Sequence, residues 1–194
     1  MNKFIFVHIQ KTGGDSVRGA LRLPTFPEGK HYGAREYIKI VGEDTWRRSY
    51  TFSFVRNPWD RLVSWWYMMK RLKNGRMNTL NPFARYIIEN ASTFEDFLCC
   101  DKTIVDEIGT KCIWRNQMDY LVDEDGRVLV DYIGRYERLK ECFGHVCQVL
   151  GRDVELPHKN KTKHDHYSAY YTRSLADMVG ERYAWDIENF GYAF

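Results

Sequence analysis

Three short runs of β-forming residues, each leading into a loop and then a helix-forming segment, constrain the fold of this chain more than any other feature. The runs occupy residues 4–8 (FIFVH), 50–55 (YTFSFV) and 128–133 (VLVDYI), and their apolar content is typical of buried strands. Alternating strands and helices predict a mostly parallel sheet flanked by helices, because parallel neighbours need a crossover connection. We therefore expect an α/β fold, and at 194 residues a single domain over residues 1–194.

Segments with helical periodicity lie between and after these runs. We expect a short helix that starts at residue 15 and closes before residue 24, and further helices over residues 34–41, 83–118, 137–150 and near the C-terminus. The three loops that follow the strands would all lie at one edge of the sheet, where ligands of such folds bind.

The clearest helix start is Asn57-Pro58, with Asn57 as the N-cap and Pro58 at the first helical position. The apolar residues that follow recur on one helical face. Arg61 and Ser64 fall on another face, so we expect them to lie outside the core.

The charge balance excludes several classes of partner. Lys and Arg total 29 and Asp and Glu total 26, which gives a net charge of +3. This balance is unlike that of a nucleic-acid coat or a polybasic membrane tail, and the dispersed basic residues form no continuous phosphate track. We expect no nucleic-acid partner, so any anion binding must come from local basic clusters.

Cysteine usage and the N-terminus bear on metal sites and location. The five cysteines form no CxxC pair and show no zinc-like spacing with histidine, so we expect reduced thiols and no metal. The apolar run before Lys11 is far shorter than a secretory signal or a membrane span. We therefore expect no membrane span and a cytoplasmic location.

The loop after the first strand combines a cation, hydroxyl groups and two glycines ahead of a helix. Such a loop can cradle a phosphate with backbone N–H groups. It is not a nucleotide-triphosphate loop of the GxxxxGK[ST] type, because its lysine precedes the glycines. The alternative is a tight turn with a solvated lysine. The residues concerned are Lys11, Thr12, Gly13, Gly14, Asp15 and Ser16.

A second basic site follows the second strand. Arg56 leaves the strand and Ser64 lies two turns into the next helix, so together they could hold one phosphate through forked arginine bonds. The alternative is an Arg56–Asp60 ion pair beside a neutral helical serine.

Together these segments resemble a known enzyme family. FVHIQKTGG and FSFVRNPWDRLVS are similar to the 5′-phosphosulfate and 3′-phosphate loops of sulfotransferases that use 3′-phosphoadenosine 5′-phosphosulfate (PAPS), especially the carbohydrate O-sulfotransferase branch. IGRYERL and the C-terminal segment resemble bacterial and viral members, so the similarity spans nearly the whole chain. Gln10 stands where the bacterial loop usually has proline.

The resemblance implies a P-loop-like fold and roles for individual residues. The loop from Lys11 to Ser16 would surround the 5′-phosphosulfate, Arg56 and Ser64 would hold the 3′-phosphate, and Lys11 would stabilise the leaving oxygen. The residues that would close over the nucleotide are Arg135, Lys161, Thr162 and Lys163.

The reaction also needs a base for the acceptor hydroxyl. His31 is the best candidate among six histidines, because heparan 2-O-sulfotransferases have a histidine in a similar context and its ordinary pKa near 6.5 suits a base. The alternatives are Glu36 as the base, or an exposed loop histidine without a catalytic role.

We therefore expect an O-sulfotransferase that moves a sulfuryl group from PAPS to a hydroxyl-bearing acceptor, on a saccharide or glycosylated metabolite, without a metal. A small-molecule kinase using ATP and magnesium is one alternative. A non-catalytic binder of anionic nucleotides or sulfated glycans is another.

Overall fold

The computed structural model describes residues 4–23, 31–73, 82–100, 113–157 and 165–194. The chain divides into two compact units. The first comprises Met1–Asn57 and Gln117–Lys161, and the second comprises Pro58–Asn116 and Thr162–Phe194. A single domain over residues 1–194 stays a prediction.

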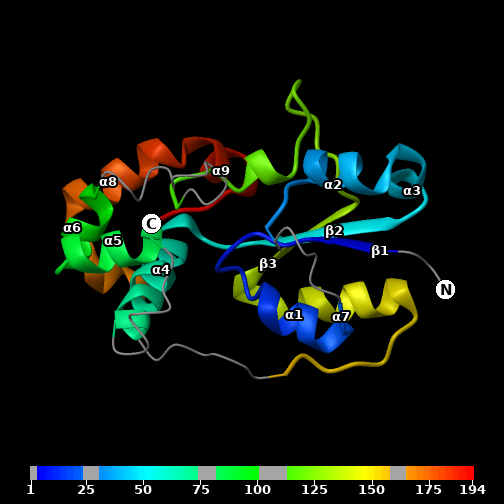
Figure 1. Cartoon of the computed structure of the whole chain (residues 1–194), viewed down its shortest axis with the longest axis horizontal. Coiled ribbons are helices and arrows are strands. Elements are labelled where there is room, and N and C mark those ends of the chain that lie inside the picture. Colours follow the sequence, from blue (N-terminus) through cyan, green and yellow to red (C-terminus); the bar gives the residue numbers. More distant parts are fainter. Residues whose placement is uncertain (1–3, 24–30, 74–81, 101–112, 158–164) are drawn as a thin grey trace. The chain divides into compact units, whose positions relative to one another are not determined.

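The first unit contains a parallel sheet, whose order in the described part of the chain is β1-β2-β3 (Figure 1). β1 (Phe4–Val7) and β3 (Tyr132–Arg135) both pair with the central β2 (Tyr50–Val55). Phe6 lies opposite Phe52, and Phe54 lies opposite Gly134. Because the strands are parallel, the segments after Val7, Val55 and Arg135 leave from the same edge of the sheet.

Helices cover both faces of this sheet (Figure 1). α1 (Gly14–Leu21) and α7 (Leu139–Leu150) lie on one face, and α2 (Ala34–Val41) and α3 (Glu43–Arg47) lie on the other. The expected α/β fold, with a parallel sheet flanked by helices, is therefore confirmed. The buried core between the sheet and the first pair of helices consists of Phe6, Val17, Leu21, Phe52, Phe54, Phe143, Val146 and Cys147.

The third strand begins later than the sequence predicts, at Tyr132 instead of residue 128. Val128 instead forms an antiparallel bridge with Val122, and the Leu129 N–H donates to the Leu121 carbonyl at 2.8 Å. The apolar run was therefore misassigned in part, because its first residues satisfy their backbone groups in a local hairpin.

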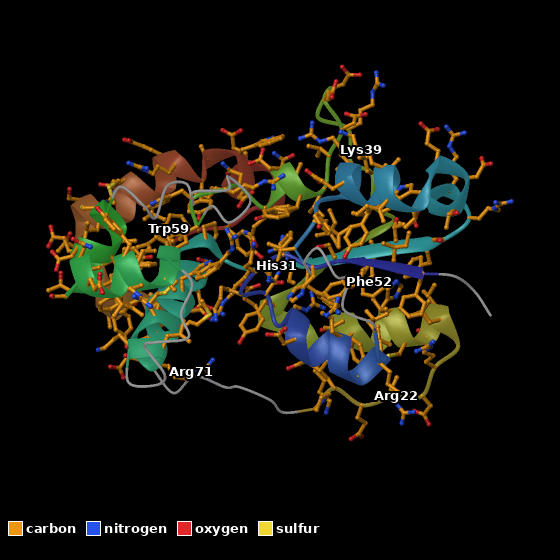
Figure 2. All side chains as sticks on the ribbon, in the orientation of Figure 1. Arg22, His31, Lys39, Phe52, Trp59 and Arg71 are labelled. Carbon is orange, nitrogen blue, oxygen red and sulfur yellow. The ribbon has the colours of Figure 1, made fainter. Side chains whose placement is uncertain are left out.

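The second unit is helical in its described part. It contains α4 (Pro58–Lys73), α5 (Pro82–Asn90), α6 (Phe94–Cys99), α8 (Arg173–Arg182) and α9 (Ala184–Phe190), with the short 3₁₀ helix η5 (Tyr167–Tyr170) before α8. α4 begins at Pro58 as predicted. Trp59 of α4, labelled in Figure 2, donates its indole N–H to the Ala176 carbonyl at 2.9 Å and accepts the Tyr171 hydroxyl at its own carbonyl, also at 2.9 Å.

The expectation that Arg61 lies outside the core is wrong. Its side chain is fully buried, and it donates to the Arg115 carbonyl at 3.1 Å and to the Tyr183 hydroxyl at 3.4 Å. Ser64 is also buried. Periodicity failed here because α4 is enclosed on several faces, so a polar face can be buried when its groups find partners.

Two further helix predictions need adjustment. The segment 83–118 contains α5, α6 and the 3₁₀ helix η3 (Met118–Tyr120), with 113–117 not helical and 101–112 outside the described residues. The C-terminal helix is divided into α8 and α9 at Tyr183. None of the helices in the described ranges combines the length and apolar character needed to cross a membrane.

Candidate functional site

The loop between β1 and α1 bends through two residues with left-handed backbone conformations. Lys11 has φ of 67° and Gly13 has φ of 82°. Thr12 is fully buried and donates its hydroxyl to the Ile9 carbonyl at 2.9 Å. The loop ends where α1 begins at Gly14, so it leads into a helix N-terminus, whose backbone N–H groups can bind an anion.

Gly14 allows α1 to start directly against the ring of His8. A Cβ atom at Gly14 would lie 1.9 Å from Cδ2 and 2.0 Å from Nε2 of His8. His8 cannot easily move away, because it is 2% exposed and its ring stacks on Phe6 with centroids 5.3 Å apart. Only glycine fits at this position.

Two glycine substitutions in α1 should therefore have opposite effects on stability. Gly14→Ala forces the His8 ring to shift and should lower the free energy of unfolding by about 1–3 kcal/mol. Gly19→Ala is the matched control, because a Cβ there meets nothing within 4 Å, and it should raise stability by about 0.5–1 kcal/mol. Urea unfolding measures both, and a Gly14→Ala protein as stable as the wild type would contradict this packing.

His31 lies beside the end of β1 (Figure 2). Its Nδ1 is 3.0 Å from the His8 carbonyl oxygen, and the two imidazole rings are 4.5 Å apart between centroids. A carbonyl oxygen only accepts, so Nδ1 carries the proton of this hydrogen bond. In the neutral ring Nε2 then carries the lone pair that a general base needs. The His8 backbone and ring thus hold His31 at the end of β1, three residues before Lys11.

Glu36, the alternative base, lies in the first turn of α2. Among the described residues its Oε2 is buried and has no hydrogen-bond partner, and a Cβ at Gly33 would lie 2.7 Å from that atom. Buried polar atoms are usually hydrogen-bonded, so this carboxylate oxygen is an exception that keeps Glu36 a candidate.

Arg56 is 5% exposed and fixed at its backbone and its side chain. Its N–H donates to Oε1 of Gln117 at 2.8 Å, and its carbonyl accepts from Nε2 of Gln117 at 2.8 Å. The guanidinium donates to the Lys11 carbonyl at 3.1 Å and lies 4.0 Å above the ring centre of Tyr136. The two predicted donor loops are therefore joined directly.

Gln10 also contributes to the loop. It is 4% exposed and accepts the hydroxyl of Tyr120 at 2.8 Å through its side-chain oxygen. A proline at this position could not make that bond. The departure from the bacterial pattern therefore gives the loop a side-chain tether to η3.

Sequence reasoning missed four residues that hold these loops. Gln117 lies directly before η3, within the segment 83–118 that was expected to be helical, and Tyr120 ends η3, beyond that segment. Tyr136 and Glu137 follow β3. Oε1 of Glu137 accepts the Asn57 N–H at 2.6 Å. Tyr136 and Glu137 did carry a signal, because they lie at the carboxyl end of a strand and within the IGRYERL segment.

The other predicted donor-binding residues are placed as follows. Asp15 is exposed and Ser16 is buried in the first turn of α1. Arg135 is exposed at the end of β3, and its N–H donates to Sγ of Cys142 at 3.4 Å. Ser64 belongs to the second unit, so its pairing with Arg56 stays a prediction. Lys161, Thr162 and Lys163 lie outside the described residues.

Two tyrosines of the first unit are poor candidates for a base. Burial raises the pKa of Tyr37 on α2. Burial and then a hydrogen bond with Cys142 raise the pKa of Tyr132 on β3. Both phenols therefore stay protonated near neutral pH.

The structure also bears on the metal and on the state of the cysteines. Within the described ranges, no group of three or more His, Cys, Asp or Glu side chains is arranged to hold a metal ion. The absence of a metal stays a prediction. Cys99, Cys100, Cys142 and Cys147 are free thiols as expected, and Cys112 lies outside the described residues.

Comparison with known proteins identifies the family of this chain. A family model described as the sulfotransferase family matches residues 1–193. No curated protein matches the chain significantly. The family match includes the Lys11 loop, Arg56 and His31, and it shows that the chain is an enzyme. The chain therefore belongs to the sulfotransferase family, whose enzymes transfer sulfuryl groups.

Proposed function

We propose that this enzyme is an O-sulfotransferase that uses PAPS as its donor and a hydroxyl of a carbohydrate or glycosylated metabolite as its acceptor. The observation that carries the proposal is the hydrogen bond from Arg56 to the Lys11 carbonyl, at 3.1 Å. It joins two cationic loops at one edge of the sheet, and a donor with two separated anionic groups needs two such loops. The carbohydrate class of the acceptor rests on the resemblance to the carbohydrate branch.

The residues divide the reaction between them. Backbone N–H groups at the start of α1 bind the 5′-phosphosulfate, and Arg56 with Ser64 binds the 3′-phosphate. Nε2 of His31 takes the proton of the acceptor hydroxyl as its oxygen forms a bond to sulfur. The bond from sulfur to the bridging oxygen breaks, and Lys11 stabilises the charge that develops on that oxygen, which leaves with 3′-phosphoadenosine 5′-phosphate.

The donor is tested by thermal unfolding with different nucleotides. We expect 3′-phosphoadenosine 5′-phosphate to raise the melting temperature more than AMP, ADP or ATP with magnesium. At 100 times its Kd a ligand adds about 2.7 kcal/mol, so the shift should be about 5–10 °C for a chain of this size. A preference for ATP with magnesium would favour the kinase, and no shift with any nucleotide would contradict the donor assignment.

The acceptor class needs a separate screen. Mass spectrometry after incubation with PAPS should show a sulfuryl group added to members of a saccharide panel and not to simple phenols. Sulfation of phenols alone would contradict the carbohydrate assignment while leaving the donor assignment intact. Binding of the bisphosphate without any transfer would favour the non-catalytic alternative.

A further inference from the structure

The backbone of Arg56 is held by a single side chain. Gln117 is fully buried, and its amide bonds to both the N–H and the carbonyl of Arg56, each at 2.8 Å. A side-chain amide that pairs with both groups of one residue continues the bonding of β2 beyond Val55, where the strand ends. This pairing fixes the point from which the Arg56 side chain leaves the sheet.

The guanidinium of Arg56 is held as well. It lies 4.0 Å above the ring centre of Tyr136, a distance typical of a cation–π contact. The same ring lies under the Lys11 loop, since a Cβ at Gly13 would be 3.3 Å from Cδ2 and Cε2 of Tyr136. Tyr136 therefore contacts both Arg56 and the loop that Arg56 reaches.

The bond that Arg56 donates ends on a residue in an unfavourable conformation. Lys11 is not a glycine, yet its φ is 67°. A left-handed non-glycine residue persists only where its surroundings enforce it. The bond from Arg56 to the Lys11 carbonyl, at 3.1 Å, is one such constraint. It sets the direction of the Lys11 peptide and the course of the loop toward the start of α1.

We infer that Arg56 is a positioning residue for the Lys11 loop, oriented by Gln117 and Tyr136, in addition to its proposed contact with the 3′-phosphate. This inference rests on the proposed function. Arg56 fixes the loop that binds the 5′ side of the donor. Loss of the Arg56 side chain should therefore lower the affinity even for a nucleotide that has no 3′-phosphate.

Adenosine 5′-phosphate (AMP) and 3′-phosphoadenosine 5′-phosphate differ only in the 3′-phosphate, so they separate the two roles. Calorimetric titration of Arg56→Lys should show AMP affinity reduced about tenfold, the effect of one charge-assisted hydrogen bond. Tyr136→Leu should reduce AMP affinity by a similar factor, and Tyr136→Phe, which keeps the ring, should bind like the wild type. Thermal unfolding of each variant checks that it is folded.

Two controls distinguish positioning from general destabilisation. The Arg56→Lys/Tyr136→Leu double variant should lose less AMP affinity than the sum of the two single losses, because Tyr136 acts partly through Arg56 and partly through its own contact with the Lys11 loop. Ser64→Ala should lower the affinity for 3′-phosphoadenosine 5′-phosphate and leave the affinity for AMP unchanged.

Each other outcome overturns part of this account. If Arg56→Lys lowers the affinity for 3′-phosphoadenosine 5′-phosphate but not for AMP, Arg56 contacts the 3′-phosphate without positioning the Lys11 loop, and the inference is wrong. If the losses in the double variant add, Tyr136 does not act through Arg56. If the wild-type enzyme binds neither nucleotide, the proposed donor itself is wrong, and the inference fails with it.

Discussion

Lys11→Met should reduce the maximal rate of sulfuryl transfer by about 10²–10³-fold, the effect of removing one group that stabilises developing charge. Methionine has a similar length to lysine and places the same demands on the left-handed backbone, where φ is 67°. The substitution therefore removes the ammonium group with little change in the loop. Release of 3′-phosphoadenosine 5′-phosphate at saturating donor measures this rate.

The matched control for Lys11→Met is Lys39→Met. Lys39 is exposed on α2 (Figure 2), so its ammonium group is solvated and the variant should transfer at the wild-type rate. If Lys11→Met instead raised the KM for the donor and left kcat unchanged, Lys11 would contribute to donor binding equally in the ground and transition states. That result would contradict its proposed role at the leaving oxygen.

His31→Asn should reduce kcat by about 10²–10⁴-fold, the usual contribution of a general base, with donor affinity unchanged. The asparagine amide can still donate a hydrogen bond to the His8 carbonyl, as Nδ1 of His31 does at 3.0 Å in the wild type. The amide cannot take a proton at neutral pH. Steady-state kinetics of transfer at saturating donor measure kcat, and calorimetric titration with 3′-phosphoadenosine 5′-phosphate measures the donor affinity.

His145→Asn is the control for this substitution. His145 is exposed on α7 and its ring lies 4.6 Å from that of Tyr132 between centroids, with the planes tilted by 38°, so its replacement should leave both kcat and the donor affinity unchanged. Full activity of His31→Asn would contradict the assignment of the base. Glu36→Gln would then be the variant expected to lose the rate.

The sheet was predictable because its signal is local. β1 and β2 lie at the expected positions, and β2 has the predicted bounds Tyr50–Val55. The start of the third strand was predicted too early, because an apolar residue such as Val128 can pair in a local hairpin as well as in the sheet. Periodicity also misplaced Arg61, because its partner Tyr183 is distant in the sequence and contributes to burying it.

In the candidate site, too, some residues could be predicted from the sequence and others could not. Lys11, Gly13 and Gly14 could be found from sequence because a cation and glycines between a strand and a helix have a known chemistry. Gln117 could not, since it lies 61 positions from Arg56 and its amide acts on the backbone of that residue. The contact between the Lys11 loop and Arg56 likewise depends on strand order, which places the ends of β1 and β2 side by side.

A transfer reaction with two labelled donors tests the central claim most directly. The enzyme is incubated with a saccharide panel, ³⁵S-labelled PAPS and, in parallel, γ-³²P-labelled ATP with magnesium, and the Lys11→Met variant serves as the blank. The account predicts ³⁵S in the saccharide fraction, little in the blank, and no ³²P in either. Transfer of ³²P without ³⁵S would contradict it and identify the enzyme as a kinase.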